Sequence, residues 1–146
     1  MGTKDWGYIL TGPGRPDRQT QVKVMSFSGV DTGDYGTMWE DKLTARPTRP
    51  LSVLVQRGFL ISAVGAGDRV HFATLLCMGV SGQDVGWLVK RLGELGATVM
   101  VHDGLHMLAP GEDPAVLIDA FERTRIALHT RRSRAKKAAK TRKRKS

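Results

Sequence analysis

The chain has 146 residues, a formal net charge of +9 and a single cysteine. This length suits one domain with its own core, and a lone Cys77 excludes an intrachain disulfide and a cysteine-based zinc cluster. No apolar run is long enough to span a bilayer and the first residues lack a signal-peptide pattern, so we expect a cytoplasmic protein.

The excess positive charge lies in residues 131–146, which we call the basic arm. The arm holds ten of the 23 basic residues and none of the 14 acidic ones, which leaves 13 basic and 14 acidic residues in residues 1–130. We therefore divide the chain into a near-neutral domain, 1–130, and the arm, 131–146. Such a charge distribution indicates a polyanionic partner, with DNA favoured over a membrane because the arm has no bulky apolar residues to insert.

Hydrophobic patterning in the first half of the chain predicts two strands and two helices. A strand is expected over residues 6–11, and Asp17 is a favourable N-cap for a helix that ends near Phe27. A weak second strand is expected over residues 37–41. Thr48 is a candidate N-cap, and the nearly continuous apolar residues of 51–64 predict a buried helix.

The second half continues the alternation of strands and helices. Residues 68–74 predict a strand, and Ser81 is the expected N-cap of a helix that ends at Gly96. Residues 97–101 predict a buried strand and residues 105–108 a short edge strand. The alternation favours an α/β fold with a mostly parallel central sheet flanked by helices.

A long helix is expected at the end of the chain, with Asp113 as N-cap and Pro114 at its first position. Its apolar residues recur near helical spacing, which gives one apolar face. Alanines within the basic arm are strong helix formers, so the helix can continue into the arm once its charges are neutralised.

Seven short motifs lie across residues 6–132, and their shared order is more specific than any one of them. They are Gly7-Tyr8, Glu40-Asp41-Lys42, Arg49-Pro50, 67–70, 79–84, 88–97 and Phe121-Glu122-Arg123. In this order and spacing they resemble the N-terminal catalytic domain of serine recombinases, the resolvase and invertase family. The resemblance implies a resolvase-like α/β fold, and it implies site-specific DNA recombination of the kind found in mobile elements.

The strand that opens the domain lacks the residues that this chemistry needs. The resemblance implies an arginine at Leu10 and a nucleophilic serine at Gly12, yet leucine carries no charge and glycine no hydroxyl. Thr11 is one residue away, and a shift of one residue points to the other face of a strand. We therefore name no catalytic residue, and regard Gly12 as the family's nucleophile position and Thr11 as a residual candidate.

The second catalytic loop implied by the resemblance has also lost its charged groups. Leu76, Cys77 and Val80 stand where the family has an aspartate and two arginines, and Arg49 is the surviving phosphate-binding arginine. Arginines stabilise the negative charge of the phosphoryl transition state, and losing one such donor costs about 10²–10³ in rate. The sequence thus predicts a degenerate, non-catalytic relative of the serine recombinases.

We expect this protein to bind DNA with weak sequence specificity, because phosphate contacts position a protein without reading bases. The resemblance also implies that the long helix mediates dimerisation and then crosses the minor groove, so we expect a nucleoid-associated homodimer or a heterodimer with an active recombinase. The predicted dimer contacts are Val116, Ala120, Phe121 and Leu128. The predicted DNA contacts are Arg131, Arg132, Arg134, Lys136, Lys137, Lys140, Arg142, Lys143, Arg144 and Lys145.

Other functions stay open at this point. One is a divergent active recombinase that uses Thr11 or a displaced serine. Another is an interaction module whose apolar helix binds a partner protein, with the arm as a solubilising tail or an RNA anchor. Residues 11–15 follow a strand and loosely resemble a phosphate-binding loop, but they lack the Gly-Lys-Ser/Thr ending. His102 and His106 lie four residues apart on either side of a turn, so we expect no metal site and no cofactor.

Overall fold

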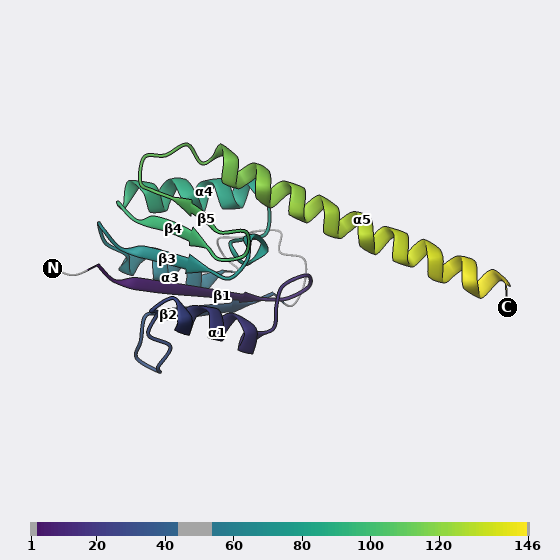
Figure 1. The fold of residues 1–146 in the computed structure, drawn as a ribbon, viewed down its shortest axis with the longest axis horizontal. Helices are drawn as coiled ribbons and strands as arrows, with labels where there is room; N and C mark the ends of the chain where they lie inside the picture. The colour runs from purple at the N-terminus through teal and green to yellow at the C-terminus, as the bar shows by residue number, and fades with distance from the viewer. Residues whose placement is uncertain (1–2, 44–53, 146) are drawn as a thin grey trace.

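The computed structural model describes residues 3–43 and 54–145, and it contains a five-stranded sheet in the order β2-β1-β3-β4-β5 (Figure 1). The first four strands of the sequence run parallel and β5 runs antiparallel to β4. The predicted α/β class and mostly parallel sheet are therefore confirmed. The strands are β1 (Asp5–Thr11), β2 (Met38–Lys42), β3 (Arg69–Phe72), β4 (Thr98–Val101) and β5 (His106–Leu108).

Three α-helices and one 3₁₀ turn connect the strands within the described residues, and a fourth helix follows the last strand. The helices are α1 (Arg18–Phe27), α3 (Val55–Ala63), α4 (Gly82–Glu94) and α5 (Ala115–Lys145), and the turn is η1 (Leu75–Cys77). Two predicted caps are confirmed, because the Asp17 carboxylate accepts from the Thr20 amide at 2.8 Å and the Ser81 hydroxyl from the Asp84 amide at 3.1 Å. The candidate cap Thr48 and the start of the predicted helix 51–64 lie outside the described residues.

The two faces of the sheet are covered by different helices. Figure 1 shows α1 on one side of the sheet and α4 on the other. The Tyr8 hydroxyl donates to Asp41 at 2.7 Å, and Asp41 also accepts from the amide of Arg57, so α3 begins on the face that carries Tyr8. On the α1 face the packing is tight, because a Cβ on Gly7 would lie 2.8 Å from Sδ of Met25.

The terminal helix α5 begins against the domain and ends far from it. The Asp113 carboxylate accepts from the Ala115 amide at 3.0 Å, as expected for its N-cap. Leu117 and Phe121 are buried in the core, and α5 packs on α4 where Gly82 leaves room for Glu122. The helix then passes the predicted domain boundary at residue 130 without a break and projects from the body, as Figure 1 shows.

Among the described residues, every helix is too short or too polar to cross a bilayer.

Candidate functional site

The basic arm is helical throughout its described length. All its described side chains, residues 131–143, are exposed. A helix turns by 100° per residue, so Arg132, Lys136 and Lys140 lie along one side. Arg131 and Arg134 point to the opposite side, which leaves the arm cationic all round and without a bulky apolar stripe. At 1.5 Å per residue the whole of α5 is about 46 Å long, and roughly its last 25 Å carry this charge.

The arm begins where α5 crosses the loop that follows β1. A Cβ on Gly14, whose φ is +77°, would lie 2.3 Å from Cδ2 of Leu128 and 3.7 Å from Nη2 of Arg132. Only glycine allows this loop to come so close to the helix. The close approach brings the first turns of the arm directly against residues 12–15.

These residues sit at a special position of the sheet. The strand order changes direction between β1 and β3, so the chain leaves these two strands toward opposite faces. In open α/β sheets this position, at the carboxyl ends of the strands, is where ligands usually bind. The loops concerned are residues 12–17 after β1 and residues 73–81 after β3.

Arg15 ties these two loops together. Its Nε donates to the carbonyl of Leu76 at 2.7 Å and its Nη2 to the carbonyl of Gly79 at 2.8 Å. Its Nη1 donates to the carbonyl of Pro13 at 3.0 Å. The sequence singled out residues 11–15 only as a loose phosphate-loop pattern, and the structural role of Arg15 depends on a loop more than 60 residues away.

The position of the implied nucleophile has an apolar neighbour. Gly12 has a φ of +146°, and a Cβ built there would lie 3.0 Å from Cβ of Leu43, while its three nearest atoms all belong to Leu43. Leu10 is fully buried, with its backbone hydrogen-bonded to the side chain of Gln21. Thr11 is half-buried at the end of β1. Arg49 lies outside the described residues.

The second implied catalytic loop is also part of the core. Leu76 and Cys77 are buried in η1, and Val80 is half-buried. Burial raises the pKa of the Cys77 thiol, which lies 3.3 Å from the hydroxyl of Thr74. A buried thiol with a raised pKa is an inert packing group at neutral pH.

The four predicted dimer contacts do not share one free surface. Val116 is 71% exposed, but Phe121 is fully buried within its own domain. Phe121 therefore has no exposed surface in this structure, because its ring packs between α5 and the rest of the core. Ala120 and Leu128 are half-buried against that core. Dimerisation itself stays a prediction.

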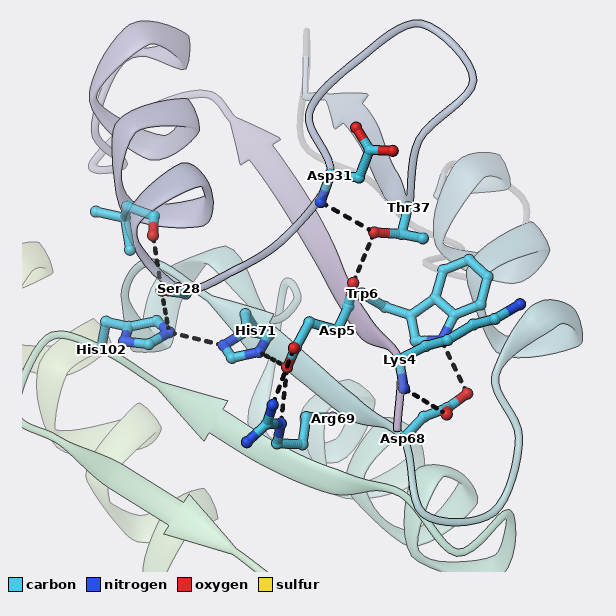
Figure 2. A network of polar contacts seen from close by, with 11 residues as sticks. Lys4, Asp5, Trp6, Ser28, Asp31, Thr37, Asp68, Arg69, His71 and His102 are labelled. Carbon is cyan, nitrogen blue, oxygen red and sulfur yellow. Dashed lines mark hydrogen bonds and ion pairs between the residues drawn. The ribbon is translucent and has the colours of Figure 1, made fainter. Parts of the chain in front are cut away.

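A polar network that the sequence did not suggest crosses the α1 face of the sheet. Figure 2 shows His71 between the Asp5 carboxylate and His102, with Ser28 beyond. The His71 Nε2–Asp5 Oδ1 distance is 2.8 Å and the His71 Nδ1–His102 Nε2 distance is 2.9 Å. The Ser28 hydroxyl lies 3.0 Å from the same His102 nitrogen and donates to the carbonyl of Val24.

One assignment of protons satisfies this whole network. The Asp5 carboxylate accepts, so His71 donates through Nε2 and a neutral His71 accepts at Nδ1. His102 then donates through Nε2, and Ser28 can only accept from it because the serine proton goes to Val24. His102 therefore does not act as a base toward Ser28, and the network is a structural tie between β1, β3, the end of β4 and the end of α1.

The charges around this tie are balanced. Burial raises the pKa of Asp5, but hydrogen bonds from Arg69 and His71 outweigh it, so that the pKa is lowered overall. Arg69 contacts the same carboxylate at 2.7 and 2.9 Å. Burial lowers the pKa of His102. Across the described chain, no three His, Cys, Asp or Glu side chains are arranged to hold a metal ion.

Comparisons with known proteins add no assignment. No family model matches the chain, and neither does any curated protein.

Proposed function

We propose that the protein is a non-catalytic DNA-binding protein of the serine-recombinase type, which binds duplex DNA through phosphate contacts of the basic arm. The observation that carries the proposal is the continuity of α5. One helix is anchored in the core by Leu117 and Phe121 and extends, without a break, into a rod that is basic on all sides.

A rod with this charge distribution fits a groove with phosphates on both walls. An α-helix can enter the major groove of B-DNA, which is about 12 Å wide, and the minor groove is narrower. A helix bound on a membrane surface needs an apolar face, and the arm has none. Duplex DNA is therefore favoured over an anionic membrane as the polyanion.

The surroundings of Gly12 support the non-catalytic part of the proposal. An activated nucleophile needs a hydroxyl or thiol beside a base, and the transferred phosphate needs cationic donors. The nearest side chain to Gly12 is Leu43, and Leu10 and Leu76 are core residues. In this proposal the protein acts as an architectural factor or as the inactive partner of an intact recombinase.

A salt titration of duplex binding tests the proposal. If about five arm residues contact phosphates, log K should fall with log salt at a slope of about −4 to −5. Replacing Lys136, Lys137, Lys140, Arg142 and Lys143 by glutamine keeps helix propensity and removes five charges. This variant should bind more weakly and with a shallower slope, because five of the ten basic residues of the arm remain.

A matched control replaces Lys23 and Lys90, exposed lysines of the domain, by glutamine. This control should bind as the natural sequence does. A slope near zero for the natural sequence would refute DNA binding through the arm. A covalent protein–DNA adduct that survives denaturation would refute the non-catalytic part alone.

A further inference from the structure

Two arginines, Arg15 and Arg132, lie next to Gly14 at the root of the arm, and neither has a carboxylate partner among the described residues. Arg15 is half-buried, and its hydrogen-bond partners are the backbone carbonyls of Pro13, Leu76 and Gly79. A guanidinium has five N–H donors, so these three bonds leave two for another acceptor. Within the described residues, no hydrogen bond or ion pair joins Arg15 to an acidic side chain.

The packing of α5 brings Arg132 to the same place. Nη2 of Arg132 lies 3.7 Å from where a Cβ of Gly14 would be, next to Leu128, which covers the loop. Burial lowers the pKa of Arg15, and the positive charge of Arg132 acts in the same direction. The described part of the chain gives Arg132 no carboxylate partner in an ion pair.

We propose that Arg15 and Arg132 form an anion site that holds one backbone phosphate of the bound duplex at the junction of domain and arm. This inference rests on the proposed function and adds a particular phosphate to it. The other described arm side chains are exposed along the outer part of the helix. This site would instead surround one phosphate with two guanidinium forks.

A phosphate is expected to bind here because two positive charges lie close together without a counter-ion among the described residues, in a place that is partly shielded from water. The chain holds Arg15 in position through three carbonyls whether or not a ligand is present, so little side-chain freedom is lost on binding. Phosphate oxygens accept from guanidinium forks in short, charge-assisted hydrogen bonds. A phosphate between the two arginines also removes their mutual repulsion, which makes this contact stronger than one on the solvated end of the arm.

The proposed site lies on the domain as well as on the arm. Arg15 ties the loop after β1 to the loop after β3, where α/β sheets usually bind ligands. A phosphate bound there contacts the domain itself as well as the arm. The duplex would then begin its contact with the protein at residues 14–15 and continue along the arm toward its end.

Duplex affinity measured for matched arginine variants tests the site. Arg132→Gln should weaken binding about tenfold, as expected for a charge-assisted contact. Arg142→Gln removes one charge from the outer part of the arm and should weaken binding only about two- to threefold. The same comparison is made in an Arg15→Lys background, which keeps the charge but removes the paired N–H donors of the guanidinium. In this background Arg132→Gln should weaken duplex binding no more than Arg142→Gln does. Equal losses for the two glutamine variants in both backgrounds would overturn the site and leave DNA binding through the arm intact.

Arg15→Lys can disturb the loops that Arg15 joins, so folding is checked by circular dichroism. Should that variant not fold, Arg132→Lys replaces it, because lysine keeps the charge of residue 132 without its fork. An Arg132→Lys protein that binds as tightly as the natural sequence would count against the two-fork site.

A second probe, inorganic phosphate, separates this inference from the proposed function. The melting temperature is compared in phosphate and in chloride at equal ionic strength. A phosphate-specific rise that Arg142→Gln keeps and Arg132→Gln loses supports the site, because a ligand that binds only the folded chain stabilises it. If the natural sequence does not bind duplex DNA, the proposed function fails. In that case a phosphate-specific rise in melting temperature would still support the anion site, as a site for free phosphate groups. The lack of such a rise would refute the site as well.

Discussion

Arg57 and Asp84 form a two-point ion pair inside the domain, with only 1% and 3% of their side chains exposed. Arg57 also donates to the carbonyl of Met78, and Asp84 accepts from the amide of Val80. The pair thus joins α3 to the start of α4 and fixes the loop between η1 and α4. The Arg57 guanidinium also lies over the ring of Trp87, 5.8 Å from its centroid.

We expect Asp84→Asn to destabilise the fold by about 3–5 kcal/mol, because it leaves the Arg57 charge buried without its counter-ion. Denaturant unfolding followed by circular dichroism measures the change in free energy of unfolding. The control is Arg18→Ala, which breaks the exposed pair of Arg18 with Glu40, whose side chains are 56% and 44% exposed. It should cost less than about 1 kcal/mol. Equal losses for both variants would contradict a dominant buried pair.

Restoring a hydroxyl at the implied nucleophile position should not restore chemistry. Gly12→Ser places a side chain at a φ of +146° and against Leu43. We expect a loss of about 1–3 kcal/mol from the backbone alone, with an additional loss from the contact. Gly67→Ser is the control, because Gly67 has a φ of +85° and no atom near its Cβ position. A Gly12→Ser protein that is as stable as the natural sequence, or that forms a covalent adduct with DNA, would contradict this expectation.

The helical conformation of the arm should contribute to binding beyond its charge. Replacing Ala138 and Ala139 by glycine leaves every charge in place but costs about 1 kcal/mol of helix stability per residue. Duplex affinity should fall about 10- to 30-fold, with an unchanged salt slope. Glutamine at both positions preserves the helix and should preserve binding. Should the double glycine variant bind as tightly as the natural sequence, the arm would act as a charged tether of no fixed shape.

The stability of the domain should depend on pH through His102. The pKa of His102 is lowered in the folded chain, whereas an unfolded histidine titrates near 6.5. The unfolded chain therefore binds more protons just below this pH, so the free energy of unfolding decreases as the pH falls through about 6.5. The lowered pKa of Asp5 acts in a separate window, below about pH 4.

Unfolding free energies at pH 7.5 and 5.5 measure this effect. His102→Gln should show a smaller decrease over this interval than the natural sequence. His129→Gln, which alters an exposed histidine of α5, should retain the full decrease. Indistinguishable decreases for all three proteins would show that His102 is not the responsible group.

The features that the sequence predicted are those set by local chemistry. Asp17 and Ser81 cap their helices because a carboxylate or hydroxyl finds an amide three residues on. The alternation of elements likewise predicted a mostly parallel sheet and a short edge strand, which is β5 in the structure. Each of these depends on residues within one turn or one strand.

The features that the sequence missed depend on contacts between distant segments. Parallel strands joined by crossovers can take several orders, and the order β2-β1-β3-β4-β5 is what brings His71 beside Asp5. The burial of Arg57 depends on Asp84, which follows 27 residues later. A lone arginine within the apolar residues 51–64 was the available signal for a buried ion pair.

The predicted dimer surface shows a similar limit of prediction from sequence. Helical spacing correctly placed Phe121 on the apolar face of α5, but periodicity does not say whether such a face meets the same chain or another one. The structure buries Phe121 in its own domain. The exposed Val116 is what remains of that surface for a partner.

Because α5 is one unbroken helix, its inner turns and its outer turns cannot rotate independently. A duplex bound to Lys140 would fix the direction of the helix axis. Because Phe121 anchors the same helix in the core, the duplex would also fix the orientation of the sheet relative to the DNA. A flexible tail of the same charge would instead let the domain rotate freely relative to the duplex. The arm would therefore set which side of the domain faces away from the duplex, and so which surface remains accessible to a third molecule.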